Sequence, residues 1–165
     1  MEDRRCLYCY QLLRPEDKDV HAACSKKFFG SSVPPLLPYS EAKMYELGLQ
    51  VIKSQAVVTG VQPKLSLHLE PSKKRDITLR FTIVGLWGSY ILKPPTDQYP
   101  NLPELEDLSM HLAETCGIKT EPHSLIRLQS GSLDYITKRC DSTRSQKVHM
   151  EDMCQLTEKL TEDKY

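Results

Sequence analysis

Three cysteines and one histidine in the first 24 residues place the strongest constraint on how this chain can fold. Cys6, Cys9, His21 and Cys24 follow the spacing C-x2-C-x11-H-x2-C. A CxxC turn brings two thiolates together, and the second close pair completes four ligands for a tetrahedral metal. Because so short a segment cannot build a core of its own, it would depend on the ion for stability. The pattern therefore predicts a structural zinc knuckle over residues 1–30.

The same cysteines allow two other interpretations, either unrelated thiols or a disulfide formed in an oxidising compartment. The N-terminal sequence MEDRRCLYCY has no apolar signal-peptide core. No apolar run approaches the roughly 20 residues that span a bilayer. The expected location is therefore the cytoplasm, where thiols stay reduced, without membrane association.

The composition indicates one ordinary domain with a small appendage. The 165 residues have zero formal net charge, 39% hydrophobic and 27% charged side chains. A neutral chain without basic side chains interleaved with aromatic ones does not indicate direct nucleic-acid binding. Basic residues outnumber acidic ones over residues 41–95 and the reverse holds over 96–165. Phosphate-binding groups are therefore expected in the first of these segments.

Apolar periodicity predicts an α+β domain after a Pro/Ser-rich linker at residues 30–40. Helices are expected over about 41–53, with Ser40 as its cap, over about 103–117, from Pro103 to Gly117, and over about 149–161. Strands are expected near residues 55–59, 65–69, 77–83, 90–93, 123–128 and 133–138, the last two joined by a hairpin turn at 129–132. An antiparallel sheet of about five strands with one packed helix accounts for this order.

Three cysteines lie outside the knuckle spacing, at positions 116, 140 and 154. They are interpreted as buried small hydrophobes. Cys116 shares one face of its expected helix with Leu105, Leu108 and Leu112.

A glycine turn, a strand lysine and a helix glutamate occur in the order of the ATP-binding parts of a kinase small lobe. Gly60 lies in a turn, where backbone N–H groups can approach phosphate oxygens. Lys93 ends an apolar strand, and Glu106 follows thirteen residues later in the first turn of a helix. Taken singly, these features have ordinary explanations, such as a tight turn or a solvated lysine. By spacing, Glu104 or Asp107 could also replace Glu106.

Four short motifs occur in an order that resembles one kinase family. They are TGVQPKL at residues 59–65, YILKP at 90–94, ITKRCD at 136–141 and EDMCQ at 151–155. Together they resemble the motifs of HipA-type serine/threonine protein kinases, the toxins of HipA/HipB toxin–antitoxin systems. The CxxC and HxxC pairs look like the cysteine knuckle of some bacterial members. The resemblance covers nearly the whole chain, and EDMCQ combined with GVQPK is far more specific than either alone.

The resemblance implies a linker and helix at residues 31–54, a kinase-like small lobe with its hinge at 55–141, and the start of the segment leading to a large lobe at 142–165. It implies ATP as the ligand of Thr59, Gly60, Val61, Gln62, Lys64, Lys93, Glu106, Lys138, Cys140 and Asp141. Residues 59–64 would form the phosphate loop, Lys93 would anchor ATP and Glu106 would pair with Lys93. The backbone of Lys138 and Cys140 would meet adenine, with Asp141 near the ribose.

Departures from the family pattern limit what is expected of the chain. Cys140 replaces a hinge phenylalanine, and Val57 stands where family loops often carry an autophosphorylated serine. A kinase also needs a catalytic and a metal-binding aspartate after the hinge, and no D-x-H-x-x-N-like motif follows Asp141. The expectation is an ATP-binding N-terminal half with structural zinc, not catalytically competent alone, that binds Mg²⁺ only with a large lobe.

The alternative is a non-enzymatic, zinc-containing protein-binding module derived from a kinase lobe. A zinc enzyme does not fit, because four Cys/His ligands leave no open coordination position. The partners implied by the resemblance are the large lobe, a HipB-like antitoxin and, as substrate, an aminoacyl-tRNA synthetase.

Overall fold

The computed structural model describes residues 4–40, 42–44, 46, 64–71, 79–84, 88–96, 98–141, 148, 150–151 and 153–158. Its elements, in chain order, are α1 (Ala22–Phe29), β1 (Leu65–Pro71), β2 (Leu79–Val84), β3 (Tyr90–Lys93), α3 (Leu102–Thr115), β4 (His123–Arg127), β5 (Leu133–Lys138) and α4 (Met153–Leu156). The strand expected near residues 55–59 and the start of the one expected at 77 lie outside the described residues.

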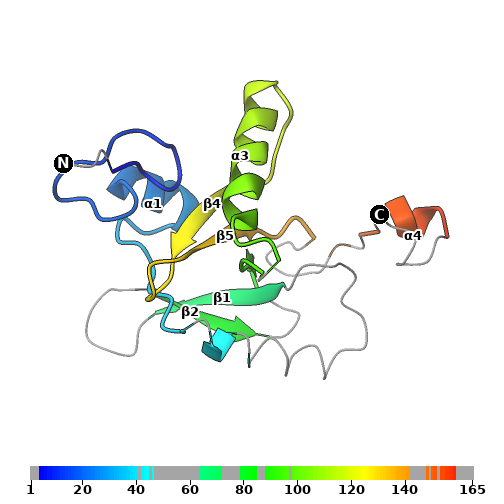
Figure 1. Cartoon of the computed structure of the whole chain (residues 1–165), viewed down its shortest axis with the longest axis horizontal. Coiled ribbons are helices and arrows are strands. Elements are labelled where there is room, and N and C mark those ends of the chain that lie inside the picture. The colour runs from blue at the N-terminus through cyan, green and yellow to red at the C-terminus, as the bar shows by residue number, and fades with distance from the viewer. Residues whose placement is uncertain are drawn as a thin grey trace.

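The strands form one antiparallel sheet of five strands in the order β2-β1-β3-β5-β4 (Figure 1). Leu67 in β1 pairs with Ile83 of β2 on one side and with Tyr90 of β3 on the other. Helix α3 connects β3 to β4 and packs against β4 and β5. The predicted α+β class, with a five-stranded antiparallel sheet and a packed helix, is confirmed.

Aromatic side chains of α1 pack into the core formed by one face of the sheet. Phe28 and Phe29 belong to the same buried cluster as Phe81 of β2 and Tyr90 of β3. The Phe29 and Phe81 rings meet edge to face with their centroids 5.8 Å apart. The Tyr90 hydroxyl donates a hydrogen bond of 3.1 Å to the Phe28 carbonyl. The N-terminal segment therefore shares its core with the sheet.

Helices α1 and α3 lie on opposite faces of the sheet. Successive side chains of a strand alternate between the two faces. In β3, Tyr90 contacts Phe28 of α1, whereas Lys93, three residues later, pairs with Glu106 of α3. Lys93 and Glu106, two of the residues expected to contact a nucleotide, therefore lie on the α3 face of the sheet. Helix α1 packs against the opposite face.

The helix ends follow the signals in the sequence. The Lys43 N–H donates to Ser40 Oγ at 3.3 Å, and residues 42–44 and 46 are helical, as the predicted cap requires. Pro103 lies in the first turn of α3. Gly117, which follows the C-cap residue Cys116 of this helix, has φ 79°, a left-handed conformation that glycine adopts without strain. No helix in the described part of the chain has the length and apolar content needed to cross a bilayer.

The predicted burial of the leftover cysteines is wrong for two of them. The exposed side chains are Leu105, Leu108, Leu112, Cys116 and Cys140. Helix α3 instead turns Asp107, which is completely buried, toward the sheet. Apolar spacing failed here because the inward face of the helix carries Asp107, whose carboxylate is hydrogen-bonded to residues distant in the chain. The side chain of Cys154 lies outside the described residues.

Gly88 provides a test of the packing that leads into β3. It is buried, and its N–H donates to Ser66 Oγ at 2.9 Å. A Cβ at this position would lie 2.4 Å from the Leu67 carbonyl oxygen. We expect Gly88→Ala to lower the free energy of unfolding by about 1–3 kcal/mol in urea titrations, because the backbone of β1 would have to move. Ser66→Ala, which removes only the acceptor, should cost less, and an equal loss would contradict the steric explanation.

Candidate nucleotide and metal sites

The four N-terminal ligand candidates converge as their spacing predicts. The ligand atoms of Cys6, Cys9, His21 and Cys24 all lie within 4.8 Å of one another. His21 Nδ1 lies 3.5 Å from Cys9 Sγ and 3.7 Å from Cys24 Sγ. Tetrahedral zinc, with Zn–S of about 2.3 Å and Zn–N of about 2.0 Å, would separate such atoms by about 3.6 Å. The cluster could therefore hold a metal ion such as zinc.

Local hydrogen bonds build this ligand set. The Tyr10 N–H donates to the Cys6 carbonyl at 2.9 Å, and the Cys6 N–H donates to the Gln11 carbonyl at 2.9 Å. Tyr10 has φ 60°, a left-handed conformation uncommon outside glycine. His21 Nε2 lies 3.0 Å from the Leu12 carbonyl oxygen, which orients Nδ1 toward the thiols.

The thiols differ in how readily they ionise. Burial would raise the pKa of Cys6, but hydrogen bonds from the backbone of His21, Tyr8 and Cys9 lower that pKa overall. Burial, followed by the neighbouring thiols of Cys9 and Cys6, raises the pKa of Cys24 to about 12. The fold thus favours ionisation of Cys6 and disfavours ionisation of the neighbouring Cys24. A bound cation would stabilise both thiolates, as expected for a thiolate-rich ligand set.

The structure brings Lys93 of β3 and Glu106 of α3 together. The Lys93 ammonium forms an ion pair with Glu106 Oε1, and the two side chains are only 20% and 23% exposed. The ammonium also lies 5.2 Å from the centroid of the buried Tyr135 ring of β5. Partial burial leaves this pair less screened by solvent than a surface pair. Asp107, which by spacing could have replaced Glu106 as the partner of Lys93, is instead hydrogen-bonded to Tyr10 and His123.

Lys64 lies at the same end of the sheet as Lys93. Leu65 of β1 pairs with Leu92 of β3 in antiparallel register, so the residues just outside this pair are Lys64 and Lys93. Two basic residues therefore occupy adjacent strand ends. The expected loop residues Thr59, Gly60, Val61 and Gln62 lie outside the described residues.

The expected hinge follows β5 directly. The Lys138 N–H donates to the Pro122 carbonyl at 2.9 Å, and the Lys138 carbonyl accepts from Thr137 Oγ1 at 3.2 Å. Cys140 is exposed. Asp141 is 6% exposed, and its carboxylate accepts two hydrogen bonds from the Arg139 guanidinium, one of them 2.7 Å long. The carboxylate expected near the ribose is thus held by a neighbouring arginine.

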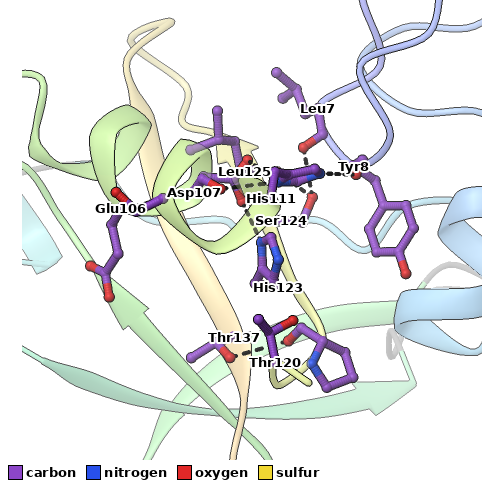
Figure 2. A network of polar contacts seen from close by, with 12 residues as sticks. Leu7, Tyr8, Glu106, Asp107, His111, Thr120, His123, Ser124, Leu125 and Thr137 are labelled. Atoms are coloured by element: carbon purple, nitrogen blue, oxygen red, sulfur yellow. Dashed lines mark hydrogen bonds and ion pairs between the residues drawn. The ribbon is translucent and has the colours of Figure 1, made fainter. Parts of the chain in front are cut away.

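A buried polar network beneath α3 was not predicted from the sequence (Figure 2). Asp107 accepts hydrogen bonds from the Tyr10 hydroxyl at 2.5 Å and from His123 Nδ1 at 2.8 Å. His111 Nε2 lies 3.1 Å from the Tyr8 carbonyl oxygen. The partners are separated by up to 103 residues, so no local spacing could have found them.

Two comparisons with known proteins bear on the chain. A family model described as HipA-like C-terminal domain matches residues 56–165. A Haemophilus influenzae protein named "Putative kinase" is 26% identical to this chain, in an alignment that covers 88% of this chain and 43% of that protein. The chain therefore spans less than half the length of this curated relative.

The knuckle geometry predicts about one equivalent of zinc per chain in protein purified without added metal, measured by elemental analysis. Cys9→Ser and Cys24→Ser should each lower the zinc content and the free energy of unfolding, since the bound ion stabilises the ligand segment. Cys116→Ser is the matched control, because this thiol is exposed and lies outside the cluster. A fully folded N-terminal segment without metal would contradict the prediction.

Proposed function

This chain belongs to the HipA-like C-terminal domain family, and on that basis we propose that it is the ATP-binding half of a HipA-like serine/threonine protein kinase toxin. The observation that carries the proposal is the ion pair between Lys93 and Glu106. In protein kinases a strand lysine and a helix glutamate form such a pair, which must be in place for ATP phosphates to be held productively. The chain order of this strand, helix and hairpin supports the same assignment.

Within this proposal the chain's own residues bind and orient the nucleotide. Lys93 would contact the α and β phosphates, and Glu106 would keep its ammonium in place. Lys64 and the loop at residues 59–62 would contribute from the neighbouring strand end. The Lys138 carbonyl and the backbone of Cys140 would face the adenine edge, and Asp141, held by Arg139, would support the ribose side.

We place these residues in the N-terminal, ATP-binding part of such a kinase, although the matching family description names a C-terminal domain. The motifs at residues 59–65 and 90–94 support this placement by resemblance. No D-x-H-x-x-N-like motif follows Asp141 in the 165 residues. The general base and the Mg²⁺ ligands would therefore come from a large lobe, with a HipB-like antitoxin and an aminoacyl-tRNA synthetase as further proposed partners.

One observation favours a second candidate, a non-enzymatic protein-binding module. Leu105, Leu108 and Leu112 form an apolar stripe on α3 and are 57%, 45% and 57% exposed. Exposed apolar stripes of this kind often mark protein contacts. The two candidates differ in whether the chain binds nucleotide.

We expect ATP to bind weakly, with a dissociation constant on the order of a millimolar, or roughly 4 kcal/mol. An open half-site buries less of a ligand than a closed pocket, and Lys64 and Lys93 balance the phosphate charge in screening solvent. Isothermal calorimetry should show binding that Lys93→Ala weakens at least tenfold and that Lys119→Ala, an exposed lysine after α3, leaves unchanged. Micromolar affinity would contradict a half-site, and no binding would favour the protein-binding module.

We also expect no phosphoryl transfer by this chain alone, because the base and metal ligands carry most of the chemistry in this class. Incubation with radiolabelled ATP should leave no label on the chain or on an added aminoacyl-tRNA synthetase. Mixing with a separately expressed large lobe should restore labelling. Labelling by the chain alone that Lys93→Ala abolishes would show that it contains a complete active site.

A further inference from the structure

We propose that Asp107 is a positioning residue that couples the metal-binding segment to α3 and so holds Glu106 against Lys93. Its consequence for nucleotide binding rests on the proposed function. The mechanical coupling does not, because it follows from contacts between the segment around Cys6 and Cys9 and the α3 helix. Nothing in the ligand spacing itself requires these contacts.

Tyr10 links the CxxC turn to α3 through its side chain. It directly follows Cys9, and its N–H bond to the Cys6 carbonyl, 2.9 Å long, fixes its left-handed backbone at φ 60°. This conformation directs the hydroxyl to Asp107 Oδ2 at 2.5 Å. The Tyr10 ring also stacks on His111 with centroids 4.5 Å apart.

The two residues between Cys6 and Cys9 hold the same region through their backbone (Figure 2). The Leu7 carbonyl accepts from Ser124 Oγ at 3.1 Å and from the Leu125 N–H at 3.2 Å. The Tyr8 carbonyl oxygen lies 3.1 Å from His111 Nε2. The turn that supplies two candidate metal ligands is therefore also the surface on which α3 and β4 rest. A displacement of the turn would lengthen or break these hydrogen bonds.

The buried carboxylate of Asp107 fixes the position of α3, because it is hydrogen-bonded both to the N-terminal segment and to β4. Asp107 has no exposed surface, and its second oxygen accepts from His123 Nδ1 of β4 at 2.8 Å. A buried carboxylate without partners is costly, so α3 is held where both bonds form. With 3.6 residues per turn, the neighbouring Glu106 then projects about 100° around the helix axis. Figure 2 shows the Glu106 and Asp107 side chains leaving α3 in different directions.

A second metal site at Asp107, His111 and His123 is a competing explanation, because their ligand atoms also lie within 4.8 Å of one another. The contacts favour a hydrogen-bonded network instead. His111 Nδ1 lies 3.0 Å from the Asp107 backbone carbonyl oxygen, and Nε2 faces the Tyr8 carbonyl. The Asp107 oxygens meet Tyr10 and His123. Both carboxylate oxygens are thus already engaged by protein groups, and the neutral His111 ring, which carries one N–H, can donate to one of the two carbonyls that it faces.

Amide hydrogen exchange across α3, read by mass spectrometry on the full chain, tests the coupling. Tyr10→Phe removes only the hydroxyl, whereas Tyr90→Phe removes the buried hydroxyl bond to Phe28 on the opposite face of the sheet. In zinc-loaded protein we expect Tyr10→Phe to speed exchange in residues 102–115 about tenfold, as loss of a hydrogen bond to a charged group would. Tyr90→Phe should leave this helix unaffected. Removing zinc with EDTA should speed exchange in α3 of the wild type, but add little to Tyr10→Phe.

The outcomes separate the coupling from its alternatives. Unchanged α3 exchange in Tyr10→Phe, or an equal effect of Tyr90→Phe, would overturn the proposal, and Asp107→Asn repeats the test if Tyr10→Phe fails to fold. Two zinc equivalents, one of them lost in His123→Ala, would overturn the network in favour of a second metal site. In calorimetry, zinc-loaded Tyr10→Phe should bind ATP several-fold more weakly than wild type. Faster α3 exchange in a chain that never binds ATP would sustain the coupling and reject the proposed function.

Discussion

A carboxylate sealed from solvent is the constraint on which the arrangement of this chain depends. Asp107 has no exposed surface, and its hydrogen-bond partners come from the N-terminal segment, Tyr10, and from β4, His123. Leaving a buried charge without its partner destabilises a protein by about 3–5 kcal/mol. The knuckle, the long helix and the hairpin must therefore assemble together, and α3 has little freedom to turn.

The positions of the side chains in the candidate nucleotide site depend on this arrangement. With α3 fixed, Glu106 meets Lys93 at the end of β3, beside the buried Tyr135 ring. The sheet register brings Lys64 to the adjacent strand end. On the opposite face, Phe28 and Phe29 of α1 pack on the sheet and support β3 from behind. Strand β3 thus carries the ion pair of Lys93 on one face of the sheet and contributes to the apolar core on the other.

Local patterns in the sequence predicted the features that depend on residues close together in the chain. Alternation predicted β1 and β2, Pro103 and Gly117 predicted the limits of α3, and the Cys/His spacing predicted a cluster able to hold a metal. Tertiary contacts could not be predicted in this way. The Asp107 network joins residues far apart in the chain, and the stripe through Leu105 indicated a buried face that the structure exposes. The hydrogen bonds of Asp107 to distant segments outweighed apolar spacing in deciding which face of α3 turns inward.

Labelling with an acyl-phosphate derivative of ATP would locate a nucleotide most directly, because this reagent acylates lysine amines that lie beside the bound phosphates. Peptide mass spectrometry is expected to find the label on Lys93, with Lys64 as the secondary site, and excess ATP should suppress both. Glu106→Gln should show reduced labelling of Lys93, since the ammonium would lose its ion-pair partner. Label spread evenly over exposed lysines such as Lys119, and insensitive to ATP, would contradict a nucleotide site built on Lys93 and Glu106.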